Sequence, residues 1–359
     1  MLLSDLPPEV INQILCGLET GDLYKAALVN HDLHVPTARV LYRDIGEATP
    51  RASIRCLHTL LFHPHLAILV RSLTIDWGSF DRAVCVTANA YRLLRAALAC
   101  LTRLTRLTLE LPLSQEPTWI LHAAQFELRA FESTFSPSHT LADFLISQPH
   151  ITELGIRMRG ARFCLPKSAL PRLNHLRAAH ATPGLLADLI EGRPVTAVSL
   201  PLYPGAASSA ALDAIARSAA QVKKLTALAF DARLPQDVMG EIAARVPHLS
   251  ALHLIAFLGQ YDTDALLDAA QTLRQLPNLE FVTCMVAAST ATTEKDERRI
   301  AAAWRESCPR LRAVILPRGK MLLYQQDKEC WSTLDDSEDG SENDISDIPP
   351  RHVAAATQT

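Results

Sequence analysis

Leu104-Thr-Arg-Leu107-Thr-Leu109 is one of ten stretches with the same spacing: an aliphatic residue, two variable positions, an apolar residue, one variable position, and a small or apolar residue. A spacing that returns every 20 to 50 residues or so is typical of a solenoid. One strand per repeat cannot bury its apolar side alone, so neighbouring repeats must stack. The residues at the centre of the ten predicted strands are Leu73, Leu107, Phe131, Leu154, Leu176, Val198, Leu228, Leu252, Val282 and Val314.

Between these stretches the apolar residues change from a period of two to a period of about 3.6, which predicts amphipathic helices. Thr182 followed by Pro183 is typical of a helix start, and helices are also expected after Ser208-Ser209, Pro235 and Asp262. Each unit is therefore strand, turn, helix, turn. A crossover that returns to the same sheet is right-handed in nearly all proteins, so the helices should cover one side of a curved parallel sheet.

The repeated spacing resembles the leucine-rich repeat in a degenerate form, and the resemblance implies a right-handed βα solenoid of about ten parallel strands. The alternative is an ordinary α/β sheet with helices on both faces, but ten similar strands in series exceed its usual size. The family carries an asparagine after each strand, and this chain has none there. The corresponding residues are Gly78, Pro112, Ser136, Arg159, Ala181, Tyr203, Arg233, Phe257, Ala287 and Gly319.

The first 46 residues follow a different pattern, without a strand signal. Prolines 7 and 8 are tolerated only in the first turn of a helix, and apolar residues then recur at helical spacing in three short segments. So short a helical unit buries little surface by itself, and a partner covering its spare apolar side would stabilise it. The segment resembles the F-box, with Asp32 and Leu33 where many members carry a basic residue and tryptophan.

The F-box resemblance implies docking onto the Skp-family adaptor of a cullin–RING ubiquitin ligase. It also implies which residues meet the adaptor. These are Leu6, Pro7, Pro8, Glu9, Val10, Ile14, Leu15, Leu23, Leu28, Val29 and Leu33.

Composition and cysteine usage limit the class of protein. Hydrophobic residues make up 48% of the 359 residues and charged residues 20%, which suits a large buried core. Apolar runs are shorter than the roughly 18 residues that predict a membrane span, and the N-terminus does not predict a signal peptide. The eight cysteines are scattered without a C-x-x-C pair, which predicts free thiols in the cytosol or nucleus.

Charge separates the last 25 residues from the rest. Residues 1–334 hold 34 basic and 31 acidic side chains, whereas residues 335–359 hold one arginine and seven acids. Such a segment cannot pack into a core and is expected to be disordered. We expect a solubilising tail. The alternative is a tail that binds a basic surface of the same chain.

Catalytic and cofactor motifs are not found. The sequence has no G-x-S-x-G, no phosphate-binding glycine loop, no H-E-x-x-H and no paired-carboxylate motif, so no enzyme activity, cofactor or metal is expected. The body of the chain is near neutral, which argues against nucleic-acid binding.

The function expected from this sequence is that of a non-catalytic substrate receptor in a Skp–cullin–F-box ligase. Its expected parts are an F-box-like unit (1–46), a solenoid (47–334) and the acidic tail (335–359). The alternative is a leucine-rich-repeat scaffold whose N-terminal helices only cap the solenoid. Alternation along the strands predicts that an unknown protein substrate contacts the concave face through Arg106, Thr108, Glu110, Glu153, Arg157, His175, Arg177, Asp231 and His253.

Overall fold

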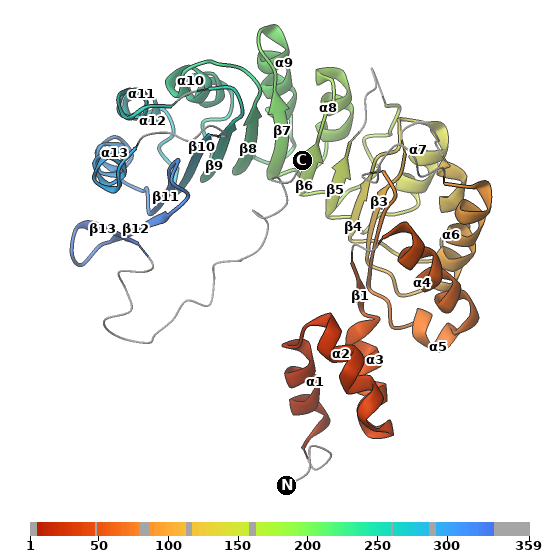
Figure 1. The fold of residues 1–359 in the computed structure, drawn as a ribbon. Helices are drawn as coiled ribbons and strands as arrows, with labels where there is room; N and C mark the ends of the chain where they lie inside the picture. The colour runs from red at the N-terminus through yellow and green to blue at the C-terminus, as the bar shows by residue number, and fades with distance from the viewer. Residues whose placement is uncertain are drawn as a thin grey trace.

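The computed structural model describes residues 6–46, 49–78, 86–112, 117–157, 163–259, 261–286 and 292–333. These residues form three N-terminal helices and a thirteen-stranded sheet whose strand order is the order of the chain. The sheet is curved, with its helices along the outer side, and the three N-terminal helices form a separate lobe below β1 (Figure 1). Each strand therefore lies beside its neighbours in sequence, the arrangement of stacked repeats.

The lobe consists of α1 (Pro8–Cys16), α2 (Thr20–Val29) and α3 (His31–Leu41). Pro8 occupies the first turn of α1, where no backbone donor is needed. Asn30 ends α2 and caps α3, because its side-chain oxygen accepts a 2.8 Å hydrogen bond from the Leu33 backbone N–H. The predicted three-helix unit is thus present.

All ten predicted strands are found, as β2 to β11, and they run parallel to one another. The prediction of about ten strands misses three. One is β1, which pairs with β2 in parallel, and the other two form an antiparallel hairpin, β12–β13, that follows β11. The bounds are β1 (Asp44–Ile45), β2 (Ser72–Asp76), β3 (Arg106–Glu110), β4 (Ala130–Ser133), β5 (Glu153–Ile156), β6 (His175–Ala178), β7 (Ala197–Leu202), β8 (Lys224–Ala229), β9 (Ala251–Ala256), β10 (Phe281–Val286), β11 (Ala313–Ile315), β12 (Met321–Gln325) and β13 (Cys330–Thr333).

The register corrects the predicted centre of one strand. Leu225, not Leu228, pairs with Val198 of β7 and Leu252 of β9. Two overlapping stretches fit the repeated spacing here. Val222-Lys-Lys-Leu225-Thr-Ala227 has Leu225 at its centre, and the stretch that starts at Leu225 has Leu228 at its centre. Leu225 is fully buried and Leu228 only partly. The regular distance of 27 residues, from 198 to 225 and from 225 to 252, was the signal that could have decided the register.

Helices on the outer side of the curve connect most of the strands (Figure 1), but within the described residues none lies between β5 and β6, where one was expected. Thr182 caps α8 as predicted, and Asp262 caps α11, whereas the helix expected after Ser208-Ser209 already begins at Ala206. Their bounds are α4 (Pro50–Phe62), α5 (Pro64–Ala67), α6 (Ala88–Cys100), the 3₁₀ helix η2 (Thr118–Ala123), α7 (His139–Ile146), α8 (Pro183–Ile190), α9 (Ala206–Ile215), α10 (Pro235–Arg245), α11 (Thr263–Asp268), α12 (Ala270–Leu273) and α13 (Glu294–Ser307).

Two hydrophobic cores stabilise the described residues. The large one lies between the sheet and the outer helices, and its buried members run from Leu57 to Trp331. The small one holds α1–α3 together through Leu15, Leu23 and Leu33, which do not belong to the large cluster. The lobe is therefore a separate packing unit, which touches the large core mainly through the partly buried Tyr42 and Ile45.

Candidate interaction surfaces

The helical lobe exposes a group of large apolar side chains. Leu28 is 86% exposed and Val29 68% at the end of α2, and Ile14 is 43% and Val10 39% exposed on α1. Four aliphatic side chains held in water on a lobe this small cost stability unless a partner covers them. These four residues, called the lobe surface below, were all predicted to meet an adaptor.

Three of the predicted adaptor residues are placed elsewhere. Leu15, Leu23 and Leu33 are between 3% and 8% exposed and form the inside of the lobe, where they hold the three helices together. Sequence pattern alone did not distinguish the two sides of such short helices. Pro7 and Glu9 are exposed and Leu6 is half-buried at the start of α1, while the side chain of Pro8 lies outside what is described.

In addition to the lobe surface, the lobe exposes three apolar residues that the prediction did not include. Tyr24 is 60% exposed, Val35 47% and Leu18 37%. Helical spacing was the available signal, because Leu18 follows Ile14 by four residues and Tyr24 precedes Leu28 by four.

The lobe joins the sheet through a short, hydrogen-bonded connection. α3 ends at Leu41, and β1 starts at Asp44. The backbone N–H groups of Arg71 and Ser72 donate to the carbonyl of Arg43 at 2.8 and 3.1 Å, so the connection is part of the sheet's own ladder. A partner bound to the lobe is consequently held in a defined orientation relative to the repeats. The domain boundary at residue 46 stays a prediction.

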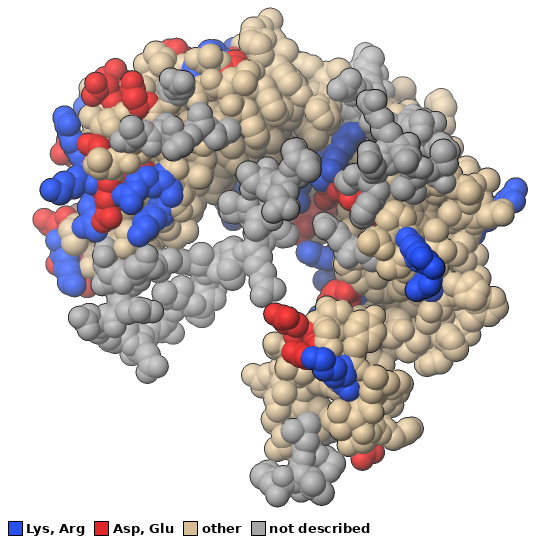
Figure 2. Space-filling view, viewed as in Figure 1, with Lys and Arg blue, Asp and Glu red and all other residues tan. Residues whose placement is uncertain are grey.

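Charged side chains gather on the inner face of the first half of the sheet (Figure 2). Arg157, which follows β5, contacts Glu110 of β3 at 2.8 Å and Glu132 of β4 at 3.6 Å. Two further pairs join neighbouring strands, Arg106 with Glu153 at 3.4 Å and Arg177 with Glu132 at 3.9 Å. The predicted residues Arg106, Glu110, Glu153, Arg157 and Arg177 therefore lie together.

These pairs determine what the inner face can bind. Three arginines face three glutamates, so their charges cancel, and the side chains remain between 18% and 55% exposed. Exposed pairs of this kind contribute little stability. Thr108 and His175 are half-buried beside this cluster. Together with Arg106, Glu132, Glu153 and Arg177 they line a pocket over β2–β6. A charged ligand that binds here must break existing ion pairs to form its own, so its net charge gains little. We therefore expect the inner face to select a ligand by its shape more than by its net charge.

The inner face of the second half of the sheet is apolar where β7, β8 and β9 end. Leu228 of β8 lies between Pro201 of β7 and Ile255 of β9 in register. Immediately after these three strands, Tyr203, Phe230 and Phe257 stack, with ring centroids 5.6 and 4.7 Å apart and interplanar angles of 20° and 5°. With the corrected register, all three occupy the repeat position at which the asparagine was sought. Stacked aromatic rings, and not asparagine side chains, therefore follow these three strands.

His253 lies on this half of the face as predicted. Its Nδ1 is 2.9 Å from the Thr283 hydroxyl, and burial, with Lys224 nearby, lowers its pKa from the ordinary value of 6.5. Asp231 corrects the prediction. It follows β8 in a turn, is 7% exposed, and pairs with Arg233 at 2.6 Å instead of facing a ligand. The misplaced register of β8 caused this error.

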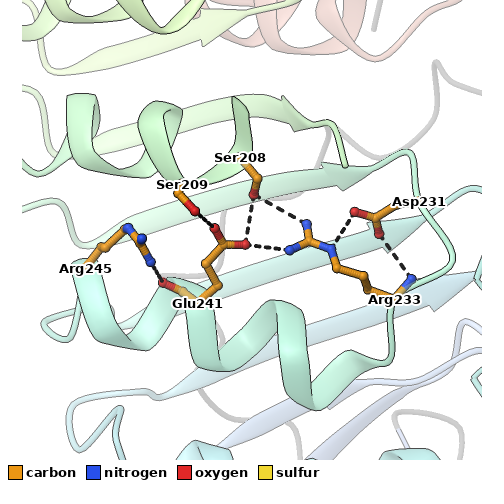
Figure 3. A network of polar contacts seen from close by, with 6 residues as sticks. All are labelled: Ser208, Ser209, Asp231, Arg233, Glu241 and Arg245. Carbon is orange, nitrogen blue, oxygen red and sulfur yellow. Dashed lines mark hydrogen bonds and ion pairs between the residues drawn. The ribbon is translucent and has the colours of Figure 1, made fainter. Parts of the chain in front are cut away.

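Asp231 belongs to a polar network between α9 and α10 (Figure 3). Arg233 bridges Asp231 and Glu241, each at 2.6 Å, and Ser208 and Ser209 donate to the Glu241 carboxylate. Burial raises the pKa of Glu241, but the hydrogen bonds from Ser209, Arg233 and Ser208 outweigh it, and the pKa is lowered. A carboxylate with a lowered pKa is a poor general base for either serine. The network therefore joins two helices through hydrogen bonds and an ion pair.

The described ranges hold neither a cluster of metal-binding side chains nor a helix that could span a membrane. No group of three or more histidine, cysteine, aspartate or glutamate side chains lies close enough to hold a metal ion there. Within the same ranges, no helix has both the length and the apolar character needed to cross a bilayer.

The N-terminal lobe matches a known family. Residues 3–34 match the F-box domain, which covers α1, α2 and the start of α3. No curated protein matches the chain.

Proposed function

We propose that this chain is the substrate-recognition subunit of a Skp–cullin–F-box ubiquitin ligase. The lobe binds a Skp-family adaptor, and the stacked repeats, a degenerate leucine-rich-repeat solenoid, bind a protein substrate. The receptor supplies no catalytic group. It raises the concentration of the substrate beside the charged conjugating enzyme, which makes transfer nearly intramolecular. Such a receptor works in the cytosol, the nucleus or both.

One observation carries this proposal: the segment that matches the F-box domain leaves its apolar side chains uncovered. The alternative function, a scaffold whose helices only cap the repeats, requires those side chains to pack against the sheet. In the structure the lobe has its own core, and Leu28 and Val29 face solvent. Uncovered aliphatic residues on an F-box match therefore favour the adaptor-binding function over the cap.

The test is capture of a purified Skp-family adaptor by variants of the lobe surface. Leu28→Asp and Val29→Asp should each weaken capture by about tenfold or more, since about 1.4 kcal/mol of lost burial already has that effect. Both side chains are exposed, so the unfolding temperature should not change. Lys25→Asp, on an 81% exposed side chain of the same helix, is the matched control. Unchanged capture by the two aspartate variants would leave the scaffold function as the better explanation.

A further inference from the structure

Four arginines lie at the edge of the sheet where the parallel strands begin. Arg71 directly precedes β2 and Arg129 directly precedes β4, whereas Arg103 and Arg172 come three residues before β3 and β6. All four line one depression, together with Glu127 and His150. Arg103, Arg129 and Arg172 are exposed and Arg71 is half-buried. These four residues are called the arginine edge.

The arginine edge differs from the inner face in that its charges are not neutralised. Within the described parts of the chain, none of the four arginines forms an ion pair. Arg71 donates to the Arg103 carbonyl at 3.1 Å, and Glu127, the acid in the depression, pairs with His150 at 3.5 Å. By contrast, Arg106, Arg157 and Arg177, on the neighbouring inner face, all contact glutamates. The arginine edge therefore holds a net positive charge, and within the described residues the guanidinium groups of Arg103, Arg129 and Arg172 donate to no other group.

The backbone fixes the spacing of these arginines. The N–H of Thr105 donates to the carbonyl of Arg71, and the N–H of Arg129 donates to the carbonyl of Thr105, at 2.8 and 2.7 Å. Adjacent strands lie about 4.8 Å apart, so Arg71 and Arg172, four strands apart, are separated by about 19 Å along the edge. An extended peptide of about six residues covers that length. Planar guanidinium groups at fixed intervals suit carboxylate or phosphate groups.

We propose that the arginine edge binds an extended acidic segment of a protein partner, with acidic groups carried as carboxylates or phosphates. That this partner is the ligase substrate rests on the proposed function, whereas the preference for acidic peptide does not. The lobe joins the sheet at this same edge, since α3 leads directly into β1. A segment bound here lies on the side of the sheet where the adaptor docks.

The chain's own acidic tail is the competing occupant, and the topology disfavours it. β12 is antiparallel to β11, and β13 is antiparallel to β12. β13 therefore runs in the direction of β11, and Thr333 ends it at the edge opposite the arginine edge. To reach Arg172, the seven acids of residues 335–347 would have to pass along the length of the strands to the opposite edge of the sheet. They would also have to pass several strands between β13 and β6.

The experiment is fluorescence anisotropy with a labelled hexaglutamate peptide, a phosphoserine peptide of equal length and a single-stranded oligonucleotide. The protein is the full chain, with a second form in which the seven tail acids are changed to their amides. Both forms should bind the acidic peptides. Arg103→Glu combined with Arg172→Glu should weaken binding by about tenfold or more. Arg92→Glu on α6 combined with Arg274→Glu, directly after α12, makes the same charge change at two exposed sites and should leave binding unaltered.

Each result decides the proposal. Tighter binding of the phosphoserine peptide identifies phosphate as the source of the negative charge, and equal binding identifies carboxylate. Binding only after the tail is neutralised makes the tail the occupant and overturns the proposal. Preference for the oligonucleotide, equal weakening in the control, or no peptide binding overturns it too. Adaptor capture is measured on the same variants, so a chain that binds acidic peptide but never captures adaptor refutes the ligase assignment alone.

Discussion

Two leucines of β8 show which of two possible registers the strand adopts, a choice that the repeated spacing alone leaves open. Leu225 is fully buried at the centre of the strand, and Leu228 lies on the inner face between Pro201 and Ile255. The same substitution must therefore have different consequences at the two positions, although both leucines look equivalent in the sequence.

Leu225→Asp should destabilise the protein by at least about 3 kcal/mol, because it buries a carboxylate without a partner. Leu228→Asp should cost about 1 kcal/mol or less, since its carboxylate reaches water. Thermal unfolding followed by circular dichroism measures both. A larger loss for Leu228→Asp would restore the register predicted from sequence.

Pairs of helices on the outer side are joined by polar contacts as well as by the core. In Figure 3 the Glu241 carboxylate of α10 receives hydrogen bonds from two serines of α9 and from Arg233. Because Asp231 and Glu241 share one guanidinium, loss of either acid leaves the other carboxylate to neutralise Arg233 alone.

Glu241→Gln should destabilise the protein by about 1–3 kcal/mol at pH 7, because it removes charge-assisted hydrogen bonds. The lowered pKa of Glu241 means that the unfolded chain takes up its proton first as the pH falls. Its contribution is thus complete above the ordinary carboxyl pKa of 4.5 and is lost as the pH falls through the lower folded value. Urea unfolding should show the difference between the native protein and the variant shrinking in acid. A difference that stays constant with pH would exclude this role.

The described residues form two packing units that share a short connection. The lobe and the sheet have separate cores, yet the β1 ladder fixes one to the other. This combination predicts that the lobe and the sheet can differ in stability although the backbone ladder joins them.

Leu15→Ala tests that division. Truncating a buried leucine costs about 2–5 kcal/mol, which is more than a lobe of three short helices is expected to withstand. Hydrogen exchange should show faster exchange across α1–α3 and unchanged protection in β4–β10. Adaptor capture should fall as an indirect result. Faster exchange throughout the sheet would mean that the two units unfold together.

Local pattern was sufficient to predict the ten parallel strands and the three N-terminal helices. A strand spacing repeated ten times and a proline-started helical segment depend on nearest neighbours in sequence, and the structure contains both. The β12–β13 hairpin was missed because it is antiparallel and lies outside the repeated spacing.

Only the tertiary structure decided which residues are buried and which charges are neutralised. Arg193 is fully buried because its guanidinium donates to the carbonyls of Pro166, Ala169 and Asp188, two of which come from the preceding repeat. The same holds for Leu15 inside the lobe. Burial and ion pairing depend on distances between residues far apart in sequence, and a spacing along the chain does not contain those distances.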